Sequence, residues 1–134
     1  MTVPPSAREI IAVVEDNADS ALLANASLSS RFDVRSYTTG VDALAAFRRY
    51  TPAVVVLDIG LRGDMDGLQV LRTMRENPAL SHVPAVAMTA YASDGMRERF
   101  LSLGFDGYVP KPLQAPEDLL DAVTALLGGR PPED

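Results

Sequence analysis

Five short apolar runs, each followed by a segment of helical periodicity, constrain the fold of this chain more than any other feature of its sequence. The runs, which we expect to form strands, cover residues 9–14, 32–37, 53–57, 83–89 and 107–109. In the segment after the fourth run, Met96, Phe100 and Leu103 stand at positions i, i+4 and i+7, as on one face of a helix. The pattern predicts a strand–helix unit repeated five times.

Capping residues mark the starts of three of these helices. Thr39 precedes Asp42 with the N-cap and N3 spacing of a capping box or a close variant. Asp66 precedes Gln69 with the same spacing. Pro116 is followed by two acidic residues, which suits a first helical turn.

Repeated strand–helix units predict a parallel sheet, because parallel neighbours need crossover connections and these are right-handed. The run 53–57 is apolar at every position, as in a strand that is covered on both faces. We therefore expect an α/β fold: a doubly wound five-stranded parallel sheet with helices on both faces and the first and third strands at its centre. In such a sheet, ligands bind outside the carboxyl ends of the strands.

Length, charge and cysteine content bound the class of protein. The 134 residues suit one domain, which we place at residues 9–128, with flexible flanks at 1–8 and 129–134. A net charge of −6 argues against direct nucleic-acid binding. Because no apolar run reaches the length of a membrane span and no signal peptide is evident, we expect no membrane partner. The absence of Cys is typical of a reducing compartment, so we expect the cytoplasm.

Charged and hydroxyl side chains follow four of the five expected strands. Glu15 and Asp16 follow the first strand, Asp58 the third, Thr89 the fourth and Lys111 the fifth. Taken singly, each has an ordinary structural explanation, such as capping of the following helix. Taken together, they are expected to converge on one rim of the sheet.

Three carboxylates in such a cluster need a compensating positive charge. At about 5 Å from one another they repel by roughly 3 kcal/mol per pair at an effective dielectric constant near 20. Lys111 can offset one charge, but hard oxygen ligands without His or Cys are what a small hard cation selects. The sequence therefore predicts a Mg²⁺ site that is suited to binding a phosphoryl group.

These residues lie in motifs that resemble the receiver domain of two-component response regulators, in its single-domain, chemotaxis-regulator-like form. The resemblance spans nearly the whole chain, and its four motifs are Val14-Glu15-Asp16-Asn17, Leu57-Asp58-Ile59-Gly60, Met88-Thr89-Ala90 and Tyr108-Val109-Pro110-Lys111-Pro112. It implies a flavodoxin-like fold with strand order 2-1-3-4-5. It also implies a phosphorylation-dependent switch that catalyses its own aspartyl phosphorylation and dephosphorylation without turning over a separate substrate.

The resemblance implies a role for each residue of the rim. Asp58 would accept a phosphoryl group from a sensor histidine kinase or a histidine phosphotransfer protein. Asp16 and Asp58 would ligate Mg²⁺ directly, Glu15 would act through a water, and Gly60 would supply a backbone carbonyl.

Two further residues and a switch complete the implied mechanism. Lys111 would pair with the phosphoryl oxygens, and Thr89 would hydrogen-bond one of them. Tyr108 would be the aromatic switch, turning inward when Thr89 moves. The changed surface of the fourth helix, fifth strand and fifth helix would bind a downstream protein target.

The loop after Asp58 departs from the commonest family pattern. It is one residue longer, and Arg62 stands where a proline is usual. Gly60 and Tyr91 occupy the positions that tune the hydrolysis of the aspartyl phosphate in the family.

Other features of the sequence have simpler explanations. The segment around Asp64 and Asp66 is similar to part of a calcium loop but lacks its later ligands, so a turn and an N-cap are expected. His82 is expected to be an exposed loop residue. The Arg48-Arg49 and Arg97-Glu98-Arg99 runs are expected on solvated helix faces.

Three alternatives are left open. The chain could be a receiver domain excised from a hybrid histidine kinase. It could be a flavodoxin-like electron carrier, although Glu15 and Asp16 would repel a flavin phosphate. It could also be a degenerate, unphosphorylated interaction module, although no acidic, Thr or Lys position of the family is lost.

Overall fold

The computed structural model describes residues 8–61, 65–90, 95–113 and 115–127. These residues form one parallel sheet of five strands in the order β2-β1-β3-β4-β5, as expected for a flavodoxin-like fold. The strands are β1 (Ile10–Val14), β2 (Asp33–Tyr37), β3 (Val54–Asp58), β4 (Ala85–Thr89) and β5 (Gly107–Pro110). Within the described residues, no helix is long and apolar enough to span a membrane.

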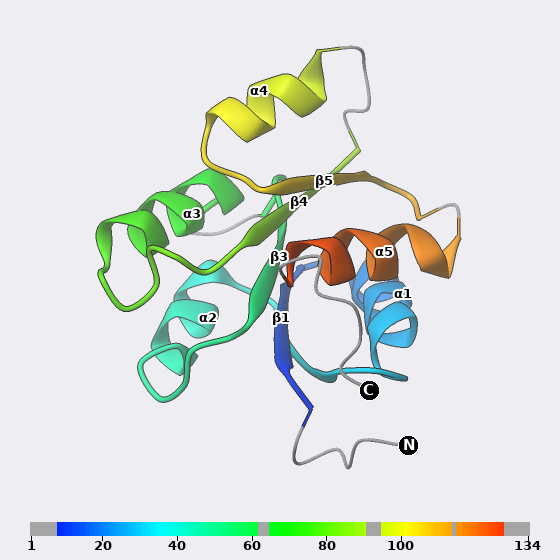
Figure 1. Cartoon of the computed structure of the whole chain (residues 1–134), viewed down its shortest axis with the longest axis horizontal. Coiled ribbons are helices and arrows are strands. Elements are labelled where there is room, and N and C mark those ends of the chain that lie inside the picture. The colour runs from blue at the N-terminus through cyan, green and yellow to red at the C-terminus, as the bar shows by residue number, and fades with distance from the viewer. Residues whose placement is uncertain (1–7, 62–64, 91–94, 114, 128–134) are drawn as a thin grey trace.

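Helices cover both faces of this sheet (Figure 1). They are α1 (Ala18–Leu28), α2 (Gly40–Ala46), α3 (Gly67–Glu76), α4 (Met96–Ser102) and α5 (Pro116–Leu126). Helices α1 and α5 pack on one face, while α2, α3 and α4 pack on the other. The doubly wound architecture follows from the right-handed crossovers that parallel neighbours require.

The sheet supplies the middle of both hydrophobic cores. Every residue of β3 and β4 is buried, as expected for strands covered on both faces. Side chains of β3 alternate between the two cores: Val55 and Leu57 face α2 and α3, while Val56 faces α1 and α5. Alternation of this kind lets one apolar run stabilise two layers of helices.

The capping residues begin the helices that they were expected to begin. Thr39 Oγ1 accepts a hydrogen bond from the backbone N–H of Asp42, 3.1 Å away. Asp66 and Gln69 form a complete capping box at the start of α3. Pro116 is the first residue of α5. These local contacts fix where each helix starts, and therefore where the preceding loop leaves the sheet.

Two expectations about the helices are wrong. The spacing of Met96, Phe100 and Leu103 predicts that all three lie on one face of the fourth helix, but α4 ends at Ser102 and Leu103 is 44% exposed. The Arg48-Arg49 pair was expected on a helix face, but α2 ends at Ala46 and both residues follow it. Helix α4 thus ends one residue before Leu103, and α2 ends two residues before Arg48. By contrast, Arg97, Glu98 and Arg99 do lie exposed on α4.

The flanks expected at residues 1–8 and 129–134 lie largely outside the described residues, which begin at residue 8 and end at residue 127. Arg8 is described, and its Nη1 donates to the carbonyl of Ser29 at 3.0 Å. Residues 62–64 and 91–94, which include Arg62, Asp64 and Tyr91, also lie outside the described residues.

Candidate functional site

The carboxyl ends of β1 and β3 place three acidic side chains together. Val14 pairs with Leu57 in the sheet, so the residues that follow them in sequence, Glu15 and Asp58, are neighbours across the rim. One carboxylate oxygen from each of Glu15, Asp16 and Asp58 lies within 4.8 Å of the other two. We call these three residues and Lys111 the acidic site. The convergence that the sequence predicted is therefore present.

Two of the three carboxylates are buried. Glu15 is 1% exposed and Asp58 is 5% exposed, whereas Asp16 is the most exposed of the three. A buried carboxylate is costly unless it is paired or hydrogen-bonded. The site therefore has to hold its charge with local donors.

Backbone amides provide two of those donors. The N–H of Asn17 donates to Glu15 Oε2 at 3.0 Å, and the N–H of Gly60 donates to Asp58 Oδ1 at 2.9 Å. Asn17 also caps α1, because its Oδ1 accepts from the N–H of Ser20 at 2.9 Å. The role implied for the Gly60 carbonyl remains a prediction, and the structure adds a contact of the Gly60 amide with Asp58.

Lys111 reaches the same carboxylates from the end of β5. Its Nζ lies 2.7 Å from Glu15 Oε1 and 3.4 Å from Asp58 Oδ2. Its backbone N–H donates to the carbonyl of Thr89 at 2.7 Å, and the Lys111–Pro112 peptide bond is cis. The contacts of Nζ with Glu15 and Asp58 place the ammonium group beside the ends of β1 and β3.

The charges in the acidic site shift one another's protonation. Burial, together with the hydrogen bond to Asp58, raises the pKa of Glu15 above its ordinary value despite the opposing effect of Lys111. Burial by itself lowers the pKa of Lys111, but the hydrogen bond to Glu15 and the charge of Asp58 outweigh it and raise that pKa. The ammonium of Lys111 therefore stays charged at neutral pH.

Close packing holds the end of β3 in place. Gly67 begins α3 directly beside Asp58, where a Cβ on Gly67 would lie 2.4 Å from the Asp58 carbonyl oxygen. Only a residue without a side chain permits that approach. The start of α3 thus fixes the backbone from which the Asp58 carboxylate projects.

Thr89 and Tyr108 lie on the β4–β5 side of the rim. Thr89 ends β4 and is buried, and its partner in the sheet is Pro110. The Tyr108 ring is half-buried and stacks on Phe100 of α4, with the ring centroids 5.7 Å apart. Tyr108 therefore links β5, the strand that ends just before Lys111, to helix α4.

The other candidates fall outside this cluster. His82 is an exposed residue before β4, as expected. Asp66 is occupied as the N-cap of α3, in line with the simpler explanation of its segment. Tyr91, Arg62 and Asp64 lie outside the described residues, so their relation to the acidic site is not part of the geometry described above.

The donor set of the acidic site fits a hard divalent cation. Three carboxylates and one ammonium, if all are ionised, leave two negative charges in excess. Every potential side-chain ligand in the cluster is an oxygen, which suits Mg²⁺ or Mn²⁺ rather than a soft metal. Because Asp16 is exposed, a cation here would remain accessible to a second ligand.

Comparisons with known proteins agree with this geometry. A model of the response regulator receiver domain matches residues 11–124. The polar-differentiation response regulator DivK of Brucella ovis is 29% identical over 119 residues, which cover 88% of this chain and 95% of DivK.

Solved structures share the fold. The BeF3-activated DrrB receiver domain is 29% identical, with a TM-score of 0.77 over 90% of this chain and 97% of that chain. The Mn²⁺-bound form of response regulator Rcp1 is 23% identical, with a TM-score of 0.68 over 88% of this chain and 91% of that chain.

Proposed function

The chain belongs to the response regulator receiver domain family, and from this membership we propose that it is a signalling switch controlled by phosphorylation of Asp58. One observation carries the proposal: Asp58 ends the central strand as a buried carboxylate, within reach of two further carboxylates and one ammonium. We place the receiver domain at residues 9–128 and its activity in the cytoplasm.

Asp58 would act as the nucleophile. An oxygen of its carboxylate would attack phosphorus, the new P–O bond forming as the P–N bond of a phosphohistidine breaks and the imidazole leaves. Phosphoryl transfer asks little covalent chemistry of the protein, mainly an in-line nucleophile and positive charge near the equatorial oxygens. The donor would be a sensor histidine kinase or a histidine phosphotransfer protein.

Asp16 and Asp58 would hold Mg²⁺, with Glu15 acting through a water and the Gly60 carbonyl as a further ligand. Support comes from the all-oxygen cluster and from the Mn²⁺ bound by Rcp1. The cation would supply positive charge to the phosphoryl oxygens. Its binding would also relieve the repulsion among the three carboxylates.

Lys111 would leave its contacts with Glu15 and Asp58 to pair with the phosphoryl group. The 3.4 Å distance from its Nζ to Asp58 Oδ2 places the ammonium close to the proposed acceptor. Thr89 would donate its hydroxyl to another phosphoryl oxygen. The added charge would thus be bound by groups that already line the rim.

Tyr108 would carry the change to the surface. Its ring stacks on Phe100 of α4, so a movement of Thr89 that frees space for Tyr108 would shift the packing between β5 and α4. The surface formed by α4, β5 and α5 would then bind a downstream protein target. A two-state surface of this kind is biased by a local change of charge.

The test is incubation with Mg²⁺ and acetyl phosphate, followed by intact mass measurement. We expect one added phosphoryl group on the wild type, none on Asp58→Ala and none after chelation of the metal. Asp19→Ala is the matched control, because Asp19 is an exposed carboxylate in the first turn of α1 outside the acidic site. Equal labelling of Asp58→Ala and wild type would show that the site assignment is wrong.

The labelling experiment distinguishes a degenerate module from a working receiver domain, but it does not distinguish a stand-alone receiver from one that belongs to a hybrid histidine kinase. A receiver domain of a hybrid histidine kinase would use the same site and give the same labelling. A degenerate interaction module would take up no phosphoryl group. A flavodoxin-like electron carrier belongs to another family than the one that this chain matches, and it would purify with a coloured flavin.

A further inference from the structure

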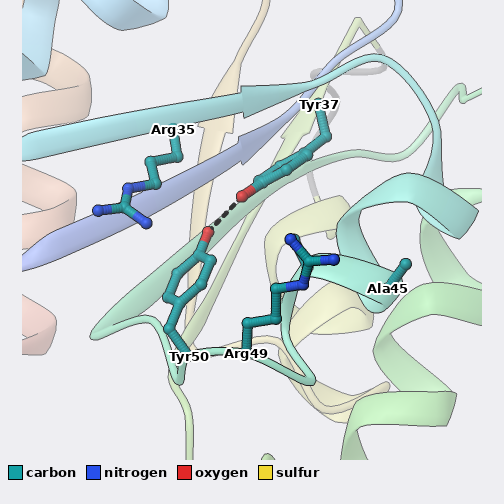
Figure 2. A pocket seen from close by; sticks show the side chains of 6 residues that line it. Arg35, Tyr37, Ala45, Arg49 and Tyr50 are labelled. Carbon is teal, nitrogen blue, oxygen red and sulfur yellow. Dashed lines mark hydrogen bonds between the residues drawn. The ribbon is translucent and has the colours of Figure 1, made fainter.

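A pocket of about 450 Å³ lies beside the edge strand β2 and the end of α2, away from the acidic site. Figure 2 shows the side chains around it, and its lining residues are Arg35, Tyr37, Ala45, Ala46, Arg49 and Tyr50. We call it the Arg49 pocket. It shares no lining residue with the acidic site, although the carbonyl of Tyr37 accepts a hydrogen bond from the backbone N–H of Glu15 at 2.9 Å.

The pocket is positively charged in an otherwise acidic protein. Two of its six lining residues are arginines and none is acidic, although the whole chain carries a net charge of −6. Arg35 pairs with Asp33 at 3.1 Å. Arg49, in contrast, has no carboxylate within ion-pair distance among the described residues.

The two tyrosines add hydrogen-bond donors rather than negative charge. The hydroxyls of Tyr37 and Tyr50 lie 2.5 Å apart and share one hydrogen bond. One of the two protons makes this bond, so the accepting hydroxyl keeps its own proton for another partner. Burial, with the contact to Tyr37, raises the pKa of Tyr50, so its phenol stays neutral at physiological pH.

Aromatic contacts hold these donors in place. The guanidinium carbon of Arg35 lies 4.9 Å from the centroid of the Tyr50 ring. Phe47 makes edge-on contacts with the rings of both Tyr37 and Tyr50, at centroid distances of 6.1 and 5.9 Å. In the view of Figure 2, the hydroxyl pair lies between the two guanidinium groups. A donor set that packing has already ordered loses less entropy when a ligand binds.

The volume argues for more than a bare ion. Pockets for small molecules typically enclose about 300–1,000 Å³ and combine apolar walls with a few polar groups. Here Ala45, Ala46 and the tyrosine rings supply apolar surface, while the arginines supply forked donors that match phosphate geometry. A ligand with an anionic group joined to a small organic part would match both the arginines and the apolar walls.

We propose that the Arg49 pocket binds a small phosphate monoester, with its phosphate between Arg49 and Arg35 and its organic part against Ala45 and Ala46. Arg49 contributes the uncompensated charge, and Arg35 reaches the ligand while it stays stacked on Tyr50. The ligand is a binding partner only, and no bond to it is made or broken.

The probe is phenyl phosphate, added without metal to the Asp58→Ala variant so that the acidic site cannot take up phosphate covalently. Binding is followed by isothermal titration calorimetry and by amide shifts in ¹H–¹⁵N spectra. We expect saturable binding, with shifts at residues 35, 37, 49 and 50. The absence of saturable binding, or shifts confined to residues around Lys111, would overturn the proposal.

Two arginine variants give the matched comparison. Arg49→Gln should weaken phenyl phosphate binding by about tenfold or more, the loss expected for one charge-assisted contact. Arg48→Gln removes the neighbouring exposed arginine, which does not line the pocket, and should leave the affinity unchanged. Equal effects of the two variants would reduce the binding to general charge attraction and overturn the proposed site.

Two further ligands test the chemical class. Benzoate offers the same ring with a carboxylate and should bind more weakly than phenyl phosphate; equal affinity would overturn the preference for phosphate. A short phosphotyrosine peptide presents the same ester from a protein. If the peptide binds more than about tenfold more tightly, by more than one charge-assisted contact, the occupant is a protein partner and the small-molecule assignment is wrong.

Discussion

Two ionic clusters, one at each end of the sheet, differ in how completely their charges are matched. At the amino ends of β4 and β5, Arg75 donates to the carbonyls of Ser81, Val83 and Gly104 and to Asp106. Asp106 Oδ2 also accepts from the N–H of Ala85 at 2.9 Å. We call this cluster the Arg75 clamp. The guanidinium of Arg75 pairs with the single carboxylate of Asp106, and its other hydrogen bonds are to backbone carbonyls.

The acidic site at the opposite end is not matched in this way. Lys111 is the ammonium that contacts Glu15 and Asp58, while Asp16 adds a third carboxylate to the cluster. The comparison teaches that the balanced cluster ties α3 to two strands, whereas the unbalanced one is arranged to receive positive charge from outside. The Arg75–Asp106 pair is partly exposed, with side chains 26% and 44% exposed, whereas the buried carboxylates of the acidic site are costly unless they are paired and hydrogen-bonded.

The largest expected effect on stability is loss of the Arg75 clamp. Arg75→Met should lower the free energy of unfolding by roughly 2 kcal/mol, because it leaves Asp106 and several carbonyls without their donor. Urea unfolding measures the change, and Arg72→Met on the exposed side of the same helix is the control. Labelling by acetyl phosphate should persist in Arg75→Met; its loss would mean that the two clusters are not independent.

Next in size is the effect of metal on the acidic site. Mg²⁺ at ten times its dissociation constant should stabilise the folded protein by about 1.4 kcal/mol, because the unfolded chain does not assemble the cluster. Thermal unfolding with and without chelator measures it. The shift should be equal in wild type and Arg75→Met and much smaller in Asp58→Asn. A shift that Asp58→Asn retains in full would place the metal elsewhere.

Replacement of Asp by Asn should change the free energy of unfolding in opposite directions in the two clusters. In metal-free buffer, Asp58→Asn should raise the free energy of unfolding by about 1 kcal/mol, because it removes one of three mutually repelling carboxylates. Asp106→Asn should lower it, because it removes the partner of Arg75. Chemical unfolding of the two variants side by side decides this, and equal signs would contradict the comparison.

The smallest expected effect is on pH dependence. The pKa of Glu15 is raised in the folded state, so the folded protein binds this proton more tightly than the unfolded chain does. Stability from this group therefore falls as the pH rises from the ordinary Glu value through the raised one, by at most about 1.4 kcal/mol per pH unit.

Glu15→Gln should remove this slope of stability against pH. The measurement is urea unfolding at several pH values between acidic and neutral, with chelator present. Glu76→Gln, at an exposed position of α3, should keep the wild-type profile. A wild-type profile in Glu15→Gln would assign the slope to another group. The raised pKa of Lys111 acts only at alkaline pH, where its contribution is lost as the ammonium deprotonates.

Much of the fold and of the acidic site was predictable, because both depend on local sequence patterns and on one topological rule. The rule is that the carboxyl ends of parallel strands lie at the same edge of the sheet. All five strands lie where the apolar runs indicated, with ends that differ by at most two residues. Asp58 is the last residue of β3 rather than the residue after the strand, whereas Thr89 ends β4 as it ends the expected run 83–89. That difference leaves their side chains on the same rim.

The predictions from sequence fail at features that depend on tertiary packing. The apolar spacing of Met96, Phe100 and Leu103 is helical, yet only Phe100 of the three is buried, because α4 ends before Leu103. Nothing in the sequence pointed to the Arg49 pocket, because Tyr37 and Tyr50 are 13 residues apart and belong to no common periodic pattern.

The sequence by itself determined the α/β class, the starts of the helices and the residues that reach the carboxyl rim. These features follow from hydrophobic periodicity, helix capping and the single direction of parallel strands. Each of these can be recognised in a short stretch of the sequence. Only the tertiary structure decided the individual partners of the charged side chains: Glu15 for Lys111 across 96 positions, Asp106 for Arg75 across 31, and the Tyr50 ring for Arg35. The physical reason is that charge pairing depends on side-chain direction and burial, which packing sets and spacing along the chain does not.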